Sequence, residues 1–187
     1  MRPMLRLAAL LALPVLLAPA ACSEQAAAPP PPPQALNAEA MGHYCGMNVL
    51  EHPGPKGQIL LASRIDPVWF SAARDAVAFT LMPDEPRDIR AVYVSDMARA
   101  ESWDTPGATN WVEVSKAWFV IDSRLRGGMG APETVPFGER SAAEAFTERN
   151  GGRVVRLAEI PHDYVLGGPA EPVRPTGATD ASAAHGH

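Results

Sequence analysis

The chain has 187 residues, of which 47% are apolar, and its 21 acidic and 16 basic residues give a formal net charge of −5 at pH 7. This length and apolar content suffice for one folded domain or two small ones. The negative charge argues against nucleic acid as a partner, because nucleic-acid-binding domains carry a surplus of lysine and arginine for the phosphates.

The amino terminus combines two arginines, a short apolar run and small residues before a cysteine, in the stretch MRPMLRLAALLALPVLLAPAAC. A membrane-spanning helix needs about 20 apolar residues, so this shorter run is typical of a signal peptide, residues 1–21. The end of the run, PAAC, resembles a bacterial lipobox and predicts lipidation of Cys22, although Pro19 replaces the usual aliphatic residue. Plain secretion is the alternative. Ser23, the residue after the lipobox cysteine, favours sorting of the lipoprotein to the outer membrane over the inner one.

Alanine and proline dominate the stretch after the lipobox. Residues 22–40 are therefore expected to form a lipid-anchored, semi-stiff linker. The chain has only two cysteines. If Cys22 carries lipid, Cys45 has no partner for an intramolecular disulfide. An unpaired thiol is prone to oxidation outside the cytoplasm, so the presence of Cys45 needs an explanation.

Residues 41–107 are expected to form a first folded module. The apolar run at 58–64 predicts a strand. Residues 67–83 place apolar side chains at helical spacing between two prolines, which predicts a helix. Residues 89–96 (IRAVYVSD) are rich in β-branched side chains and predict another strand.

Residues 108–167 are expected to form a second module. Residues 110–123 predict one bent strand or two paired strands, 139–152 a helix that ends at two glycines, and 153–160 a strand. Because the halves show the same order of elements and each is too small for its own core, we predict an α+β fold of two small strand-strand-helix-strand modules packed together. The Pro-, Gly- and Ala-rich residues 168–187 are predicted to be a disordered tail.

The exported thiol lies two residues before a methionine, in the stretch HYCGMNV. Thiolate and thioether are soft donors and select Cu(I) over hard cations. Gly46 can adopt backbone angles that let Cys45 and Met47 face one ion, and an extended strand would also place both on one face. We therefore predict a Cu(I) site at Cys45 and Met47. The alternative is a buried, chemically inert cysteine.

Two sulfurs seldom complete a metal site, and three further residues are candidate ligands. These are His43, His52 and Met129, the last in the glycine-rich segment RGGMGAP. Met82 and Met97 are interpreted as core residues. Zinc is disfavoured because a closed zinc site uses four cysteine or histidine ligands.

A function of another class is a periplasmic thiol-dependent enzyme, acting in redox exchange or organometal bond cleavage. Cys45 would then be a nucleophile activated by His43 or His52. No third, orienting residue is evident, and the chain has no G-x-S-x-G or phosphate-binding glycine loop. A structural docking module with an inert Cys45 is a third possibility.

Several blocks in the same order resemble the NosL family, accessory lipoproteins of nitrous-oxide reductase maturation. They are HYCGMNVLEHPGPKGQI, PVWFSAARDAVAFTLMPDEP, AVYVSDM, NWVEVSKAWFVIDS, GGMGAPETVPFG and GGRVVRLAEIPHDYVLG. The resemblance implies a non-catalytic, periplasm-facing lipoprotein that binds one Cu(I) and delivers it for assembly of the reductase's copper-sulfide centre. It implies an ABC-type transporter complex of the same system as partner.

The same resemblance centres the metal site on the C-G-M motif, here Cys45 and Met47. It does not identify the third ligand among His52, His43 and Met129. It implies paired strand-strand-helix-strand modules with a distant likeness to an organomercurial lyase. Lyase activity is not implied, because that chemistry relies on cysteines that this chain lacks.

Overall fold

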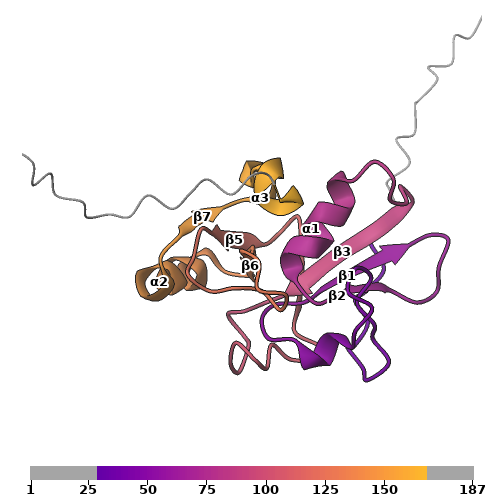
Figure 1. Cartoon of the computed structure of the whole chain (residues 1–187), viewed down its shortest axis with the longest axis horizontal. Helices are drawn as coiled ribbons and strands as arrows, with labels where there is room; N and C mark the ends of the chain where they lie inside the picture. Colours follow the sequence, from indigo (N-terminus) through magenta and orange to yellow (C-terminus); the bar gives the residue numbers. More distant parts are fainter. Residues whose placement is uncertain (1–28, 168–187) are drawn as a thin grey trace, which may run out of the picture.

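A computed structural model describes residues 29–167 of the chain. The expected signal peptide, the anchor at Cys22 and the tail 168–187 lie outside these residues. Within the described part, no helix is both long enough and apolar enough to cross a membrane. The elements form two small sheets, each with its own helix (Figure 1).

The first unit is built on an antiparallel sheet with strand order β2-β1-β3-β4. Its elements are β1 (Gly57–Leu61), β2 (Val68–Phe70), α1 (Ala73–Leu81), β3 (Ile89–Ser95) and β4 (Trp111–Glu113). Every residue of β1 is buried, because β1 pairs on both edges and α1 covers one face. Gly57 permits this cover: a Cβ there would lie 2.4 Å from the Cβ of Ala76 on α1.

The second unit repeats the pattern on a three-stranded antiparallel sheet with strand order β6-β5-β7. Its elements are β5 (Trp118–Ile121), β6 (Val135–Phe137), α2 (Arg140–Asn150) and β7 (Arg153–Val155). Helix α2 ends at Gly151, whose φ of 70° suits glycine. The predicted α+β fold of two packed strand-strand-helix-strand modules is confirmed.

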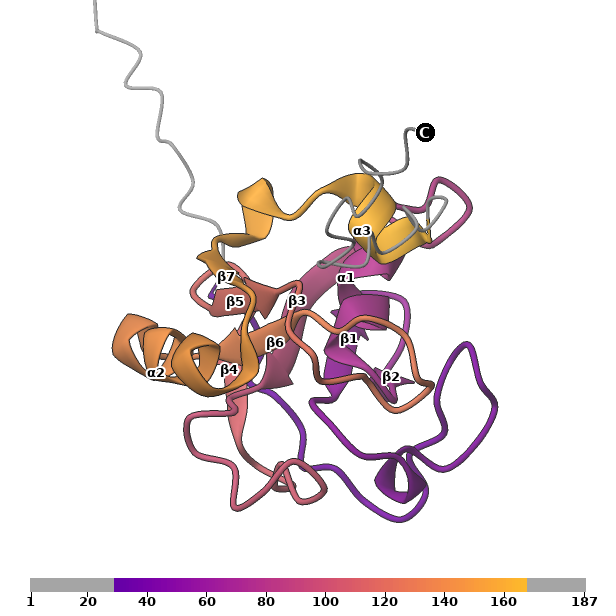
Figure 2. The same cartoon turned by 60° about the vertical axis from the view of Figure 1, so that its left-hand side comes forward.

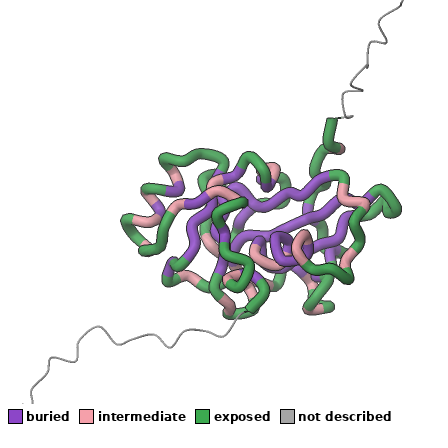
Figure 3. The backbone as a smooth tube through the Cα atoms, turned by 90° about the horizontal axis from the view of Figure 1, so that it is seen from above, coloured by how far each residue is buried: buried purple, intermediate pink, exposed green. Residues whose placement is uncertain are grey.

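The two units share one apolar core. Phe119 and Ile121 of β5 and Val155 of β7 pack in the same buried cluster as Ile59 of β1 and Val94 of β3. Short elements close it: η2 (Leu157–Glu159) and α3 (His162–Leu166), which lies against α1 (Figure 2). Figure 3 shows the buried backbone running through the middle of the molecule. Neither module is therefore expected to fold alone.

Two segments differ from the sequence expectation. The helix predicted from Pro67 begins only at Ala73, because Val68–Phe70 forms strand β2 with all three side chains buried. Aromatic and β-branched side chains favour this extended conformation. Residues 110–123 do form two strands, but these do not pair with each other: β4 joins β3 in the first sheet. The module boundary expected at 107/108 therefore does not coincide with the boundary between the sheets.

The end of the expected linker packs on the first sheet. The backbone N–H of Gln34 donates to Oε1 of the buried Gln58, and Nε2 of Gln58 donates back to the Gln34 carbonyl, at 2.8 and 2.9 Å. The hydroxyl of Tyr93 donates to the carbonyl of Pro31 at 2.7 Å. Leu36 is 6% exposed. The folded unit therefore begins before residue 41.

The shared core makes a direct prediction for Phe119, which is fully buried. Phe119→Ala should lower the free energy of unfolding by about 3–5 kcal/mol, and the whole domain should still unfold in one transition. Urea unfolding followed by tryptophan fluorescence and by far-UV circular dichroism measures both quantities. Ile65→Ala, at a side chain that is 92% exposed, is the control and should change stability by less than about 0.5 kcal/mol. Two separated transitions would contradict a shared core.

Candidate metal centre

The C-G-M motif lies in a tight turn that closes on itself. The N–H of Gly42 donates to the carbonyl of Met47 at 2.9 Å, and the N–H of Gly46 donates to the carbonyl of Gly42 at 2.8 Å. Gly46 has φ of 64°, a conformation that glycine adopts without strain. The N–H of His43 bonds the carbonyl of Trp69 on β2 at 2.8 Å, which fixes the turn to the edge of the first sheet. Of the two conformations considered for the motif, Cys45 and Met47 therefore adopt a turn and not an extended strand.

The thiol of Cys45 lies on the inner side of this turn. Its Sγ is 3.6 Å from Oγ of Ser71 and 3.9 Å from the carbonyl oxygen of Met47. A Cβ at Gly42 would lie 2.5 Å from Sγ, so any side chain at position 42 would displace the thiol. Cys45 is half-buried, whereas Met47 is 40% exposed. The turn therefore presents one sheltered sulfur and one open sulfur.

Ser71 connects the turn to the glycine-rich segment that carries Met129. A Cβ built at Gly128 would lie 3.0 Å from the carbonyl oxygen of Ser71 and 2.7 Å from Cβ of His52. Gly128 is thus packed where a side chain would not fit. Met129, the next residue, is 52% exposed. The structure brings the Cys45 turn, His52 and the Met129 segment around one serine.

His52 has one bonded ring nitrogen and one buried free one. Nδ1 lies 3.3 Å from the carbonyl oxygen of Gly128, and Nε2 is buried without a hydrogen-bond partner. With the proton on Nδ1, this bond leaves a lone pair on Nε2, as in metal-binding histidines held by a backbone carbonyl. The imidazole also lines a cavity of about 230 Å³ with Leu36, Leu50 and Lys56.

His43, the other histidine of the motif, faces away from the thiol. Its Nε2 lies 3.2 Å from Oε1 of Glu85, and its ring packs against Phe70 and Phe79 with centroids 5.8 and 5.5 Å apart. Met82 was expected in the core but is 36% exposed, and its Sδ accepts a hydrogen bond from Tyr44 at 3.4 Å. The clue in the sequence is Pro83, which ends the helix and leaves Met82 at the surface.

Beneath the turn lies a buried cation that the sequence analysis did not single out. Lys56 is 1% exposed. Its Nζ donates to the carbonyls of His52, Pro53 (3.1 Å) and Ser71 (3.4 Å). Burial lowers the pKa of Lys56 to about 8, against the opposing attraction of Glu133. The ammonium holds the His52 segment against the residue that touches the thiol.

Glu133 is a buried carboxyl near this lysine. Its Oε1 accepts hydrogen bonds from the backbone N–H groups of Arg74 and Thr134 at 2.8 and 2.9 Å. Its Oε2 is buried without a partner, and a Cβ at Gly127 would lie 2.4 Å from it. Burial raises the pKa of Glu133 to about 8. Lys56 and Glu133 stand in glycine- and proline-rich segments, where a charged residue is expected at the surface, which is why they were missed.

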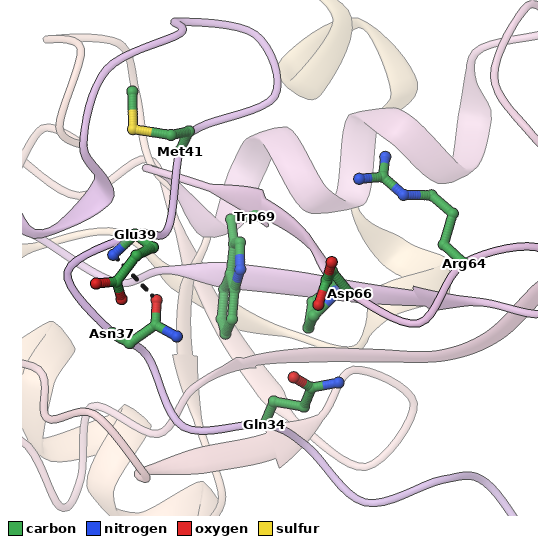
Figure 4. Close-up of a pocket in the computed structure, with 8 residues that line it drawn as sticks. Gln34, Asn37, Glu39, Met41, Arg64, Asp66 and Trp69 are labelled. Atoms are coloured by element: carbon green, nitrogen blue, oxygen red, sulfur yellow. Dashed lines mark hydrogen bonds between the residues drawn. The ribbon is translucent and has the colours of Figure 1, made fainter.

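Within residues 29–167, no group of three or more His, Cys, Asp and Glu side chains is close enough to hold a metal ion. A site here must therefore use thioether sulfur as well. A cavity of about 320 Å³ lies near the motif and is lined by Met41 and Trp69 among others (Figure 4). Trp69 stands in its middle, with Met41 and Asp66 beside it, and neither Cys45 nor Met47 lines it. This cavity is not the sulfur site.

Comparison with known proteins gives consistent matches. A family model described as NosL matches residues 33–165. The copper-binding lipoprotein NosL of Achromobacter cycloclastes is 48% identical over 134 residues, which are 71% of this chain and 69% of that protein. The one of Stutzerimonas stutzeri is 32% identical over 118 residues, 63% of this chain and 60% of that protein.

A solved structure agrees with these matches. The crystal structure of the copper chaperone NosL from Shewanella denitrificans matches with a TM-score of 0.65 at 35% identity, covering 71% of this chain and 97% of that one. The similarity therefore extends over both sheets and includes the turn with Cys45.

The buried pair predicts how stability depends on pH. The pKa of Glu133 rises from 4.5 to about 8 on folding, so the folded chain keeps a proton that the unfolded chain releases. Stability should be greatest below pH 4.5 and fall by up to about 1.4 kcal/mol per pH unit as the pH rises toward 8. Above pH 8 the lowered pKa of Lys56 acts in the opposite direction, so a stability minimum is expected near pH 8.

Urea unfolding at pH 5, 8 and 10 measures this profile. Glu133→Gln keeps an oxygen for the N–H groups of Arg74 and Thr134 and should flatten the fall between pH 5 and 8. Glu148→Gln, at an exposed position on α2, is the control and should leave the profile unchanged. An unaltered slope in Glu133→Gln would exclude this carboxyl as its source.

Proposed function

The chain belongs to the NosL family, and from this membership we propose that it is a non-catalytic copper chaperone that carries Cu(I). The single observation that carries the proposal is the closed turn of the C-G-M motif. It holds the half-buried thiol of Cys45 and the exposed thioether of Met47 two residues apart. Soft sulfur donors favour Cu(I), and a partner can reach an exposed thioether to take the ion.

His52 and Met129 are the proposed further ligands. Nε2 of His52 is free of hydrogen bonds, and its other nitrogen is held by the carbonyl next to Met129. Gly128, the residue before Met129, packs against both His52 and Ser71, and the hydroxyl of Ser71 lies 3.6 Å from Sγ of Cys45. The side chains of Met47 and Met129 are 40% and 52% exposed, so their thioethers can reorient toward an ion without disturbing the core.

The surroundings of the thiol favour a chaperone over a thiol-dependent enzyme. A base within hydrogen-bond reach is the usual activator of a cysteine nucleophile. The polar neighbours of Sγ are a serine hydroxyl and a backbone carbonyl. Both nearby imidazoles bond elsewhere, His43 to Glu85 and His52 to Gly128.

Delivery and location form the finer part of the proposal. The chain delivers copper for assembly of the copper-sulfide centre of nitrous-oxide reductase, with an ABC-type transporter complex as partner. It acts on the periplasmic side of the outer membrane, anchored through Cys22. Supporting a docking role, three apolar side chains next to Cys45 are 40–51% exposed: Met41, Tyr44 and Met47.

The copper site predicts distinct losses in two variants. In an anaerobic competition titration against a strong Cu(I) chelator, the mature chain should bind one Cu(I). Cys45→Ala should abolish this binding, and Met47→Leu should weaken it at least about tenfold, equal to about 1.4 kcal/mol. Affinity should also fall in acid, because protons compete for the thiolate.

Further variants rank the remaining ligands. His52→Gln and Met129→Leu should each reduce Cu(I) affinity less than Cys45→Ala does. Met41→Leu removes an exposed thioether just outside the turn and should leave affinity unchanged. Full Cu(I) binding by Cys45→Ala would end the assignment.

The lipid anchor predicts a change of fractionation. In bacterial cells that express the full chain, the protein should sediment with membranes, and density-gradient separation should place it in the outer membrane. Cys22→Ser should move it to the soluble periplasmic fraction, because the acyl-bearing residue is lost. Unchanged sedimentation of Cys22→Ser would contradict anchoring at this residue.

A further inference from the structure

A second group of metal-binding side chains adjoins the C-G-M turn on another flank. It consists of His43 in the turn, and Met82 and Glu85 in the loop that follows α1. Nε2 of His43 lies 3.2 Å from Oε1 of Glu85. The hydroxyl of Tyr44 lies 3.0 Å from the same Oε1 and 3.4 Å from Sδ of Met82. Imidazole, carboxylate and thioether thus meet around one phenol.

We propose that His43, Glu85 and Met82 form a second copper site, which takes Cu(II) and is separate from the Cys45–Met47 pair. Imidazole nitrogen and carboxylate oxygen suit Cu(II), which such donors bind more tightly than other divalent first-row ions, and a thioether serves as a weak additional ligand. Zinc is the poorer match, because its ligands are thiolate, imidazole and carboxylate, and the thioether of Met82 is none of these.

The spacing of the donor atoms suits one ion. Two ligand atoms bound about 2.0 Å from Cu(II) at the right angles of tetragonal coordination are about 2.8 Å apart, so Nε2 and Oε1, now 3.2 Å apart, need to approach each other only slightly. The Tyr44 hydroxyl is a hydrogen-bond donor to this cluster and not one of its proposed ligands.

The cluster is both held in place and open to solvent. The ring of His43 packs edge-on against Phe70 and Phe79, which directs Nε2 toward Glu85. The side chains of His43 and Glu85 are 35% and 15% exposed. Among the described residues, His43 is the only ion-pair partner of Glu85. The adjacent Arg87 donates instead to backbone carbonyls of Thr80 and Met82, so no permanent cation neutralises the carboxylate.

This site gives the turn two holding positions for copper. His43 precedes Cys45 by two residues, yet Sγ faces Ser71 while the imidazole faces Glu85. An ion bound at the second site would thus be held by the same short segment that carries the thiol. The proposal does not depend on the Cu(I) site, because the two donor sets have no residue in common.

The test uses the mature chain with Cys45→Ser, Met47→Leu, His185→Ala and His187→Ala all present. This background removes the C-G-M sulfurs and the two tail imidazoles. Titration with Cu(II) alone should give one equivalent bound, with an electron paramagnetic resonance spectrum that shows nitrogen coupling. Adding His43→Phe or Glu85→Gln should weaken binding at least tenfold, and Met82→Leu should weaken it less.

Two control variants distinguish a metal site from a cluster that serves only as a set of structural hydrogen bonds. His162→Ala removes an exposed imidazole on α3 and should leave Cu(II) binding unchanged. Tyr44→Phe removes the phenol's hydrogen bonds but no proposed ligand, so Cu(II) binding should persist even if the thermal midpoint falls. Unchanged Cu(II) affinity in His43→Phe, or loss of affinity in His162→Ala instead, would overturn the proposal, whatever the result for Cu(I) at Cys45.

Discussion

The ammonium of Lys56 sits in the interior with three carbonyl acceptors, and the arrangement of the sulfur site follows from them. Removing a charge from water costs several kcal/mol unless hydrogen bonds and an opposite charge replace the lost hydration. The carbonyls of His52, Pro53 and Ser71 must therefore stay around Nζ. The buried carboxyl of Glu133 lies nearby and attracts the ammonium once it ionises, toward pH 8. Two segments distant in sequence are fixed to each other beneath the turn.

The glycine-rich segment depends on the same constraint. Gly127 and Gly128 approach Glu133, His52 and Ser71 more closely than any side chain would allow. The close packing of these two glycines thus places Met129 near Ser71, without any contact made by the Met129 side chain itself. A soft-metal site needs this combination: a rigid base that places the donors, and exposed thioethers free to leave the ion. Here the rigid base is the buried Lys56 with its carbonyl acceptors, and the exposed apolar side chains are those of Met47 and Met129.

Periodicity and spacing were enough to predict much of this molecule. The α1, α2 and β3 segments and the repeated module show in the pattern of apolar residues, whereas the C-G-M spacing left a glycine-permitted bend and an extended strand both open. Trp69 was misplaced in a helix because a three-residue strand is too short for a period to show. The environments of Lys56, Glu133 and Ser71 could not be predicted, since tertiary packing alone buries them. The direction of His43 depends on Phe70 and Phe79, which pack on its ring.

The paired amides of Gln34 and Gln58 join the amino-terminal segment to the central strand of the first sheet. The Tyr93 hydroxyl adds a second attachment at Pro31. Pro31 and Gln34 precede Met41 in the chain, so a pull on the amino-terminal segment would act on these hydrogen bonds before it reached Met41. The turn that carries Cys45 is thereby mechanically isolated from whatever the amino terminus is tied to. The geometry of the Cys45 turn is therefore set by the first sheet and not by the residues that precede Pro31.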